Sequence, residues 1–353
     1  MSKQKVIICH NLQENLNVAI KACPHDKLFV LVDEHTQQLC LPLISNFKCF
    51  EGAHIICIEA GDIHKNLETL ATVWNELGNH GATRHSLMIN LGGGMVTDLG
   101  GFAASTFKRG IKYINIPTTL LAMVDASVGG KTGINFNGLK NEIGVFSPAE
   151  YVLIDTEFLK SLDTQNLLSG YAEMLKHGII SSTEHWAELL NFDMDHIDYK
   201  ALQALVAKSV QIKEEIVEQD PFERGIRKAL NVGHTVGHAF ESLALETNQP
   251  VLHGYAVAWG IVCELYFSFC KVGFPKDKLR QTIQFIKEHY GSLTIDCKQY
   301  DRLYEFMTHD KKNNAGIINF TLMSEIGDIR INQSATKEEI FEQLDFYRET
   351  MGY

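Results

Sequence analysis

The sequence predicts an α/β amino-terminal domain with a mostly parallel, Rossmann-like sheet, followed by a mainly α-helical carboxy-terminal domain. Two patterns predict this fold class. Up to residue 155, short apolar runs rich in β-branched residues alternate with stretches of helical period, as parallel strands do when helices cover both faces of their sheet. Beyond residue 160, long stretches of helical period dominate. We therefore place the two domains at residues 1–158 and 159–353.

The individual elements follow from these patterns and from the residues that end them. Strands are predicted at 6–9, 27–32, 54–58, 87–91, 111–116 and 151–154. Helices are predicted at 64–77, 167–180, 185–190, 200–217, 228–245, 255–270, 277–289 and 337–347, and a β-hairpin at 317–331 turning near Gly327 and Asp328. The apolar stretch 255–270 contains Glu264 and is shorter than the roughly 20 residues of a membrane-spanning helix, so we expect a buried helix.

Composition and charge exclude several classes of protein. The chain has 353 residues, of which 45% are hydrophobic and 21% charged, as in a globular protein and not in a disordered or fibrous one. Its 32 basic residues are outnumbered by 43 acidic ones, giving a formal net charge of -11. That balance argues against a surface that binds nucleic acid or an anionic membrane by bulk electrostatics, and we expect neither partner.

Cysteine usage and the amino terminus predict the compartment. The eight cysteines include no C-x-x-C pair, which indicates reduced, packed thiols and neither a disulfide framework nor a cysteine-based zinc site. The first ten residues lack the charged and long apolar segments of a signal peptide. We therefore expect a cytoplasmic protein.

A glycine-rich segment follows the predicted strand at 87–91. Gly92, Gly93 and Gly94 come directly before a helical stretch, so backbone N–H groups there are expected to approach a pyrophosphate at the positive helix end. The segment is not the G-x-G-x-x-G fingerprint, and a tight strand-to-helix turn is the alternative. Asp33, at the end of an earlier strand, is expected either to bind a ribose hydroxyl pair or to cap a turn.

A second glycine-rich stretch covers residues 125–133. It lacks the G-x-x-x-x-G-K-[ST] spacing of a phosphate-binding loop, so we reject a nucleotide-hydrolysing site. Lys131 stands between Gly130 and Gly133, and the glycines leave its ammonium group accessible. We expect this lysine to contact a phosphate or a cofactor.

Histidines and one glutamate predict a metal site. His234 and His238 are four residues apart on one predicted helix face, His253 lies close to the start of the next helix, and Glu173 interrupts an apolar stretch. Two imidazoles and one carboxylate form the ligand set of a catalytic zinc or a similar ion. Spacing alone leaves open whether His238 or His253 is the second imidazole ligand.

Two glycines beside these histidines predict a close backbone contact. Gly233 and Gly237 fall within the predicted helix, where each glycine costs about 1 kcal/mol relative to alanine. That cost suggests that something packs directly against the backbone.

Basic residues near these segments predict an anionic small substrate. Arginine pairs bidentately with carboxylates, and lysine acts as a point charge on phosphate. A solvated surface is the alternative for each residue taken alone. The residues are Lys108, Arg109, Lys140, Lys176, Lys213, Arg227, Lys311 and Lys312.

The motifs taken together resemble the 3-dehydroquinate synthase family, metal- and NAD-dependent cyclases of the shikimate pathway. The matching segments run in family order from about residue 60 to residue 312: 92–98, 108–110, 117–122, 125–131, 140–141, 172–176, 231–239 and 253–254. The resemblance implies an amino-terminal NAD-binding domain, a helical domain that binds metal and substrate, an active site between them, and a homodimer.

The resemblance also implies roles for individual residues. The metal ligands, to zinc or cobalt, are Glu173, His234 and His253. The catalytic residues are Lys131, His238 as a proton-transfer or hydrogen-bonding group, and Glu223, which matches a proposed proton acceptor. The substrate contacts are Arg109, Asp125, Lys131, Asn141, Lys176, Lys213, Arg227, Asn231 and one of Lys311 or Lys312. The NAD contacts are Asp33, Asp62, Lys65, Gly93, Gly94, Met95, Val96, Thr97, Asp98, Thr118, Thr119, Lys131, Lys140, Phe158 and Ser161.

One departure from the family pattern concerns the cofactor. Where the family usually has Gly-Glu-x-x-Lys, this chain has Gly61-Asp62-Ile63-His64-Lys65. The carboxylate of Asp62 stands on a stem one methylene shorter, so its direct contact with the ribose is in question, whereas the cofactor itself is not.

The implied reaction converts the sugar phosphate 3-deoxy-D-arabino-heptulosonate 7-phosphate to 3-dehydroquinate and phosphate. NAD oxidises one hydroxyl, the new ketone acidifies the adjacent carbon so that phosphate leaves, bound NADH restores the alcohol, and ring opening with an aldol step closes the carbocycle. The alternatives are a related cyclase acting on sedoheptulose 7-phosphate, a metal-dependent polyol dehydrogenase of the same fold, and a non-catalytic binding protein.

Overall fold

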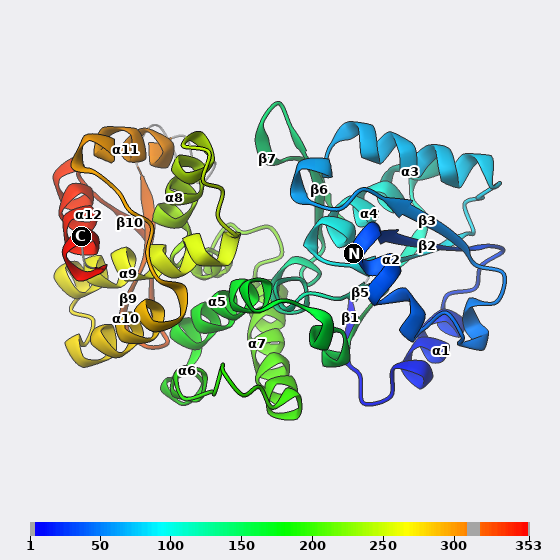
Figure 1. The fold of residues 1–353 in the computed structure, drawn as a ribbon, viewed down its shortest axis with the longest axis horizontal. Coiled ribbons are helices and arrows are strands. Elements are labelled where there is room, and N and C mark those ends of the chain that lie inside the picture. The colour runs from blue at the N-terminus through cyan, green and yellow to red at the C-terminus, as the bar shows by residue number, and fades with distance from the viewer. Residues whose placement is uncertain (1–3, 309–317, 352–353) are drawn as a thin grey trace. The chain divides into compact units, whose positions relative to one another are not determined.

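The computed structural model describes residues 4–308 and 318–351, and the chain divides into two compact units. Unit 1 comprises Met1–Asp163 and Asp198–Val210, and unit 2 comprises Thr164–Ile197 and Gln211–Tyr353 (Figure 1). Helix α7 (Tyr199–Gln219) begins in unit 1 and continues into unit 2.

Within the described residues, unit 1 is built on a six-stranded sheet in the order β1-β8-β5-β4-β2-β3. Every pairing in this sheet is parallel, which confirms the prediction. Strands β4 and β8 are buried along their whole length and are mostly apolar. The buried Asn90 of β4 donates from Nδ2 to Asn115 Oδ1 of β5 at 2.8 Å. The strands are β1 (Lys5–Ile8), β2 (Leu28–Asp33), β3 (His54–Ile58), β4 (Leu87–Gly92), β5 (Lys112–Pro117) and β8 (Tyr151–Ile154).

Parallel pairing places the carboxyl ends of these strands along one edge of the sheet. Gly92 of β4 pairs with Pro117 of β5, and Asp33 of β2 pairs with Ile58 of β3. The segments that follow these four strands contain most of the predicted NAD contacts. In open α/β sheets, ligands bind outside this edge.

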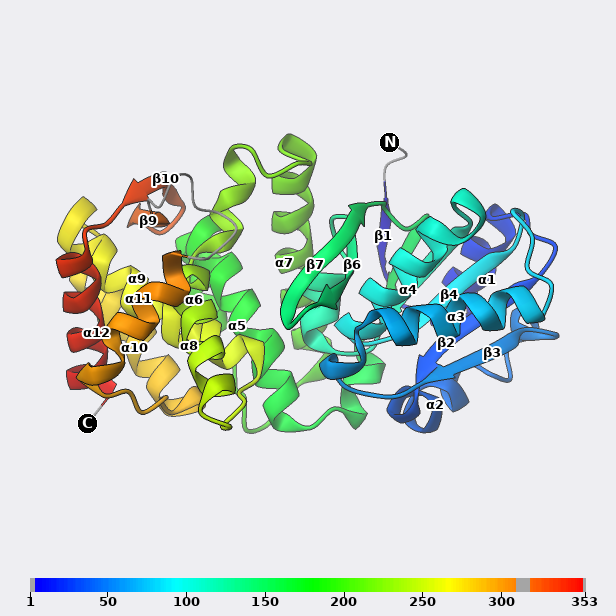
Figure 2. The ribbon, with the colours of Figure 1, turned by 90° about the horizontal axis from the view of Figure 1, so that it is seen from above.

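Helix α4 packs against the sheet through a glycine. Unit 1 contains the helices α1 (Leu12–Ala22), α2 (Glu34–Leu39), α3 (Leu67–Asn79) and α4 (Gly94–Thr106). Helices α3 and α4 lie side by side (Figure 2), and the indole Nε1 of Trp74 in α3 donates to the carbonyl of Ala103 in α4 at 3.3 Å. A side chain at Gly100 of α4 would collide with Asn90 and come within 2.8 Å of Leu31 Cδ2, so glycine is needed for this packing.

A β-hairpin in unit 1 was not predicted from the sequence. Strands β6 (Lys131–Phe136) and β7 (Leu139–Phe146) pair antiparallel. Asn137 and Gly138 connect them with φ values of 50° and 77°, the conformation of a two-residue hairpin turn for which Asn-Gly is the strongest sequence signal. Lys131 therefore begins a strand and does not stand in a loop.

Unit 2 is mainly helical, as predicted. Its helices are α5 (Thr164–Ser181), α6 (Thr183–Leu190), α8 (His234–Glu246), α9 (His253–Val272), α10 (Lys276–Tyr290), α11 (Tyr300–Thr308) and α12 (Lys337–Met351). The predicted hairpin is confirmed as β9 (Asn319–Glu325) and β10 (Asp328–Ser334), with the turn at Gly327. The predicted helix 228–245 is wrong in one respect: it is divided, because Gly233 has a φ of +80° and caps α8.

Helix α9 is the centre of unit 2. It packs against α5, α8, α10, α12 and β9 (Figure 1). At 20 residues it is longer than predicted, and among the described helices it alone is long and apolar enough to cross a membrane. However, 67% of its apolar window is buried inside the protein, which is typical of a core helix and agrees with the predicted burial.

Short helices complete both units. They lie at Leu41–Leu43, Lys48–Phe50, Asp62–His64, Phe107–Arg109, Ala122–Ala126, Thr156–Ser161, Ile226–Asn231 and Cys297–Gln299. All eight cysteines lie in described residues and are free thiols. The prediction that they are packed is wrong for Cys57, Cys270 and Cys297, which are exposed.

The packing of α4 on the sheet gives a first prediction. Gly100→Ala forces a methyl group against Asn90 and Leu31, and overpacking of this kind costs about 1–3 kcal/mol. We expect a lower Tm by circular dichroism.

Gly78→Ala is the matched control, because a methyl group at Gly78 in α3 meets nothing within 4 Å. Alanine there is expected to stabilise the helix by about 0.5–1 kcal/mol. Equal Tm values for the two variants would contradict the packing argument.

Candidate functional site

Three helices of unit 2 bring the predicted metal ligands together. His234 is the first residue of α8, His253 is the first residue of α9, and Glu173 lies within α5. Glu173 Oε1 is 3.3 Å from His234 Nε2 and 3.4 Å from His253 Nε2. Ligands about 2.0–2.2 Å from a tetrahedral zinc lie about 3.3–3.5 Å apart, so these spacings match two edges of such a site.

His238 belongs to the same cluster. One ring nitrogen from each of His234, His238 and His253 lies within 4.8 Å of the other two. His238 is one helical turn beyond His234, and their ring centroids are 5.3 Å apart. The structure therefore brings together all four groups that the sequence predicted, and proximity alone does not select three of them as ligands.

Hydrogen bonds leave the Nε2 atoms of two imidazoles available as ligands. His234 Nδ1 lies 3.1 Å from the carbonyl of Val232, and His253 Nδ1 lies 3.2 Å from Glu241 Oε2. When Nδ1–H donates to such an acceptor, Nε2 carries the lone pair that binds a metal. Glu173 Oε1 is buried and accepts no hydrogen bond within the part of the chain that the structure describes. These residues fit a divalent metal.

Glycines allow the helix backbones to approach closely enough to build the cluster. A side chain at Gly254 in α9 would collide with the carbonyl of Ser169, one turn before Glu173 in α5. A side chain at Gly260 would collide with the carbonyl of Gly233, and a Cβ at Gly237 would lie 2.9 Å from the carbonyl of Ala256. The close contact that Gly233 and Gly237 predicted is thus confirmed, and it is made by α9.

The charges around Glu173 are balanced without a metal. Burial alone would raise the pKa of Glu173, but the ammonium of Lys176, with which it forms a buried ion pair, and the facing imidazoles hold that pKa well below its usual range. Burial lowers the pKa of His253, but Glu173 and Glu241 outweigh burial and raise it to about 10. In the metal-free protein, His253 therefore carries a proton at neutral pH.

Two other predicted residues of unit 2, Asn231 and Glu223, contact each other. Asn231 Nδ2 donates to Glu223 Oε1 at 2.8 Å, and the buried Arg227 donates from its guanidinium to the carbonyl of Pro221 at 2.7 Å. Lys213 in α7 is also buried. The prediction for Lys311 or Lys312 falls outside the described residues.

In unit 1, predicted NAD and substrate contacts form one polar network. The ammonium of the buried Lys65 lies 2.5 Å from Asp98 Oδ2 and 2.5 Å from Asn141 Oδ1. Lys140 Nζ is 3.4 Å from Asp62 Oδ2. Although Asp62 is shorter than the usual glutamate, its carboxylate thus lies beside another predicted NAD contact.

The glycine-rich turn lies beside this network. Gly93 is the N-cap of α4 and carries no side chain to satisfy the first N–H groups of the helix, which suits an anion. Thr118 N donates to the carbonyl of Gly92 at 3.0 Å, and a Cβ at Gly93 would lie 3.1 Å from Thr119 Cγ2. The turn at 93–98 and the pair Thr118 and Thr119 are therefore neighbours.

The remaining predicted residues of unit 1 have varied surroundings. Asp33 caps α2, because its Oδ1 accepts from Thr36 N at 2.7 Å, so the capping role exists whether or not Asp33 binds ribose. Phe158 is buried, and Ser161 Oγ donates to its carbonyl at 3.1 Å. Arg109 is exposed at a φ of 70°, Lys131 is exposed, and Asp125 is half-buried.

Two carboxylates beside the metal cluster were not predicted as site residues. Glu241 contacts His253, and Glu264, noted in the sequence only as an interruption of an apolar stretch, contacts the backbone on both sides of His234. A charged residue in an otherwise apolar helix was the available signal for Glu264.

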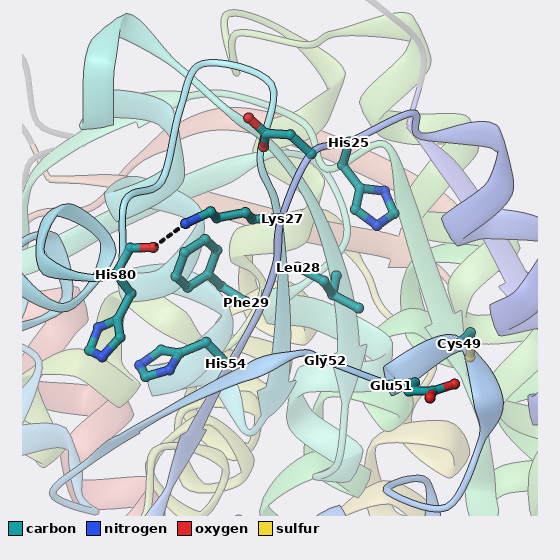
Figure 3. Close-up of a pocket in the computed structure, with 10 residues that line it drawn as sticks. His25, Lys27, Leu28, Phe29, Cys49, Glu51, Gly52, His54 and His80 are labelled. Atoms are coloured by element: carbon teal, nitrogen blue, oxygen red, sulfur yellow. Dashed lines mark hydrogen bonds between the residues drawn. The ribbon is translucent and has the colours of Figure 1, made fainter.

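A second group of potential ligands lies at the opposite edge of the unit 1 sheet. His54, at the start of β3, Glu76 and His80 place one ligand atom each within 4.8 Å, beside a cavity of about 390 Å³ whose lining includes Lys27 and Phe29 (Figure 3). The rings of His54 and His80 stack at 3.6 Å with an interplanar angle of 24°, and Glu76 Oε2 lies 3.3 Å from His54 Nε2 and 3.4 Å from His80 Nδ1. We attribute this cluster to packing and hydrogen bonding.

Comparisons of the sequence identify its relatives. Residues 55–169 match the family model described as 3-dehydroquinate synthase N-terminal, and residues 170–313 match the one described as 3-dehydroquinate synthase C-terminal. Over 352 residues, covering 100% of both chains, the sequence is 58% identical to the 3-dehydroquinate synthase of Parabacteroides distasonis. It is 35% identical over 321 residues to that of Streptococcus pyogenes serotype M3, covering 90% of this chain and 89% of the relative.

Solved structures share the fold. A 2-epi-5-epi-valiolone synthase from Streptomyces hygroscopicus, with NAD+ and Zn2+ bound, superimposes with a TM-score of 0.86 and 25% identity, covering 99% of this chain and 98% of that one. A 2-deoxy-scyllo-inosose synthase complexed with carbaglucose-6-phosphate, NAD+ and Co2+ superimposes with a TM-score of 0.84 and 21% identity. The match covers 98% of this chain and 96% of that one.

The proton on His253 gives a second prediction. Its pKa is raised, so the proton's contribution to the stability of the metal-free protein is fully present below about pH 6.5 and is lost as the pH rises through about 10. A metal ion bound by His253 would displace this proton. Calorimetric titration with Co2+ at pH 8, in buffers of different protonation enthalpy, is expected to show release of about one proton.

Glu241→Gln removes one of the two carboxylates that raise the pKa of His253. In this variant the pKa of His253 is expected to be lower than in the wild type. Release of a proton on Co2+ binding is therefore expected to disappear at a lower pH than in the wild type. Absence of proton release at pH 8 in the wild type would show that His253 is neutral before the metal binds.

Proposed function

The chain belongs to the 3-dehydroquinate synthase family, and on that premise we propose how its residues convert 3-deoxy-D-arabino-heptulosonate 7-phosphate to 3-dehydroquinate and phosphate. The observation that carries the proposal is the cluster of Glu173, His234, His238 and His253. This cluster supplies metal ligands and one further imidazole. The chain that contains it is 58% identical, over its full length, to a 3-dehydroquinate synthase. The reaction class is a carbon–oxygen lyase that eliminates phosphate.

The cofactors are NAD and one divalent metal, zinc or cobalt. Glu173, His234 and His253 would hold the metal, which polarises the substrate hydroxyl that is oxidised. This choice is supported by the contacts of Glu173 Oε1 with both Nε2 atoms. The turn at 93–98, Thr118, Thr119 and the network of Lys65 with Asp98 would hold NAD, the hydride acceptor and donor.

Proton transfers fall to side chains beside the ligands. His238 lies one helical turn beyond His234 in the same cluster, and the family resemblance supports its assignment to the substrate as a proton-transfer or hydrogen-bonding group. Glu223 is held through its Oε1 by Asn231, which orients its carboxylate as a proton acceptor. Substrate phosphate is a further base in such an elimination.

Basic residues would bind the two anionic groups of the substrate. Arg227 has its guanidinium oriented by the carbonyl of Pro221, which suits bidentate pairing with a carboxylate. Lys131 and Arg109 are exposed and suit phosphate. These residues act by positioning the substrate and stabilising charge.

The protein is proposed to be a cytoplasmic homodimer. Strand β7 is exposed along its whole length and carries the exposed side chains of Leu139, Ile143 and Val145. An apolar edge strand of this kind is suited to pairing with another chain. The free thiols of all eight cysteines support the cytoplasmic location.

The proposed activity is tested by product analysis. With NAD and Co2+, the purified protein is expected to release one phosphate per heptulosonate phosphate consumed, without net accumulation of NADH, because NAD is regenerated within each turnover. Phosphate is measured colorimetrically and NADH by absorbance.

Sedoheptulose 7-phosphate and a polyol are the control substrates. Faster phosphate release from sedoheptulose 7-phosphate would show a different cyclase. Steady formation of NADH from the polyol, without phosphate release, would show a dehydrogenase.

The ligand set is tested by two substitutions in one cluster. His253→Ala removes a proposed ligand and is expected to weaken metal binding by more than about 100-fold, beyond the usual effect of an outer-shell substitution. His238→Ala is the matched control and is expected to retain one metal per chain while losing activity. Metal content is measured by mass spectrometry, and the reverse pattern would make His238 the second imidazole ligand.

A further inference from the structure

The proposed metal lies at an electrostatically unfavourable place in the fold. His234 and His253 are the first residues of α8 and α9. The N-terminus of a helix carries about half a positive unit charge and favours anions, whereas cations are favoured at the opposite end. Two positive helix ends therefore face the cation that these imidazoles would hold.

Helix α8 also lacks a capping side chain of its own. Its N-cap is Gly233, and no side-chain hydrogen bond from the N-cap is formed. In most helices, Ser, Thr, Asp or Asn at this position accepts the free N–H groups of the first turn. Here another helix supplies the acceptor.

Glu264 of α9 is that acceptor. Its carboxylate is buried, and it accepts from Gly233 N at 2.7 Å through Oε2 and from Thr235 N at 2.9 Å and Val236 N at 3.1 Å through Oε1. Both oxygens act as acceptors, as they do in an ionised carboxylate. The bonded N–H groups come immediately before and after His234.

We propose that Glu264 is a positioning residue for the metal site. Its negative charge offsets the positive end of α8, and its three hydrogen bonds fix the backbone from which His234 extends. This inference rests on the proposed metal site. It assigns to Glu264 the role of making a helix N-terminus compatible with a bound cation.

The N-terminus of α9 is capped differently, but there too a carboxylate lies beside the positive end of the helix. Gly254 N donates to Ser169 Oγ at 3.1 Å, and Glu241 Oε2 lies 3.2 Å from His253 Nδ1. At α9 a hydroxyl caps the backbone, while a carboxylate contacts the imidazole. At α8 the Nδ1 of His234 lies 3.1 Å from the neutral carbonyl of Val232, and the carboxylate of Glu264 accepts from the backbone N–H groups on either side of it.

Two substitutions separate the charge from the shape of Glu264. Glu264→Gln keeps the length and removes the charge, whereas Glu264→Asp keeps the charge and shortens the stem. We measure the Kd for Co2+ by competition with a chelator, the visible absorption of bound Co2+, and the Tm of the metal-free protein. Glu339→Gln is the matched control, because Glu339 Oε2 also accepts an N–H group, that of Thr336, just before a helix, α12.

The proposal predicts a definite order of affinities. Glu264→Gln is expected to bind Co2+ at least about tenfold more weakly than the wild type, with an unchanged absorption band at saturation because the ligands are the same. Glu264→Asp is expected to stay within about threefold, and Glu339→Gln is expected to match the wild type.

Other results overturn the proposal. A purely structural cap would lower the metal-free Tm of Glu264→Gln and leave the Kd for Co2+ unchanged. If Glu264→Gln does not fold, folded Glu264→Asp decides the matter, and weakening of tenfold or more in that variant refutes the role of charge. Failure of the wild type itself to bind Co2+ would instead refute the proposed metal site.

Discussion

Close backbone contacts of α9 with α5 and with α8 position the proposed metal ligands. Gly254 lies against Ser169 of α5, and Gly260 lies against Gly233 of α8. Each of these contacts lies close in sequence to a proposed ligand. His253 directly precedes Gly254, and His234 directly follows Gly233. Glu173 follows Ser169 by four residues, about one helical turn. A methyl group at any of these glycines would separate the helices, so the glycines determine the ligand spacing as much as the ligands' own side chains do.

The same contacts concentrate charge in the centre of unit 2. Glu173, Lys176 and Glu264 are buried, and burial of a charged group is costly unless it is paired or hydrogen-bonded. Lys176 pairs with Glu173, and backbone N–H groups pair with Glu264. The charged groups that would be costly in an ordinary core are here mutually compensated, and this compensation is what permits a polar site inside a helical unit.

Much of the fold was predictable because the spacing of apolar residues along the sequence indicates which faces of helices and strands are buried. The parallel strands were found for this reason. The hairpin β6–β7 was missed although Asn137-Gly138 signalled its turn, because the glycines around Lys131 were interpreted only as leaving its ammonium group accessible. Helix 228–245 was drawn as continuous because spacing does not reveal that Gly233 adopts a left-handed conformation.

The candidate site was predictable to a different degree. Spacing and the family resemblance named Glu173, His234, His238 and His253, which lie together in space. Glu264 lies about 30 residues along the sequence from the N–H groups whose hydrogen bonds it accepts. These hydrogen bonds form only when α8 and α9 pack together. Sequence spacing within one helix cannot reveal such a partner.

The preformed geometry also bears on how the protein is loaded with metal in the cell. Glu173 Oε1 already lies 3.3 Å from His234 Nε2 and 3.4 Å from His253 Nε2 without an ion, unlike a zinc finger, which folds only when its metal binds. The side chain of His253 is 28% exposed, so it is accessible to an ion from solvent. With the proposed ligand set, metal loading would exchange the proton on His253 for a cation in a scaffold that is already folded.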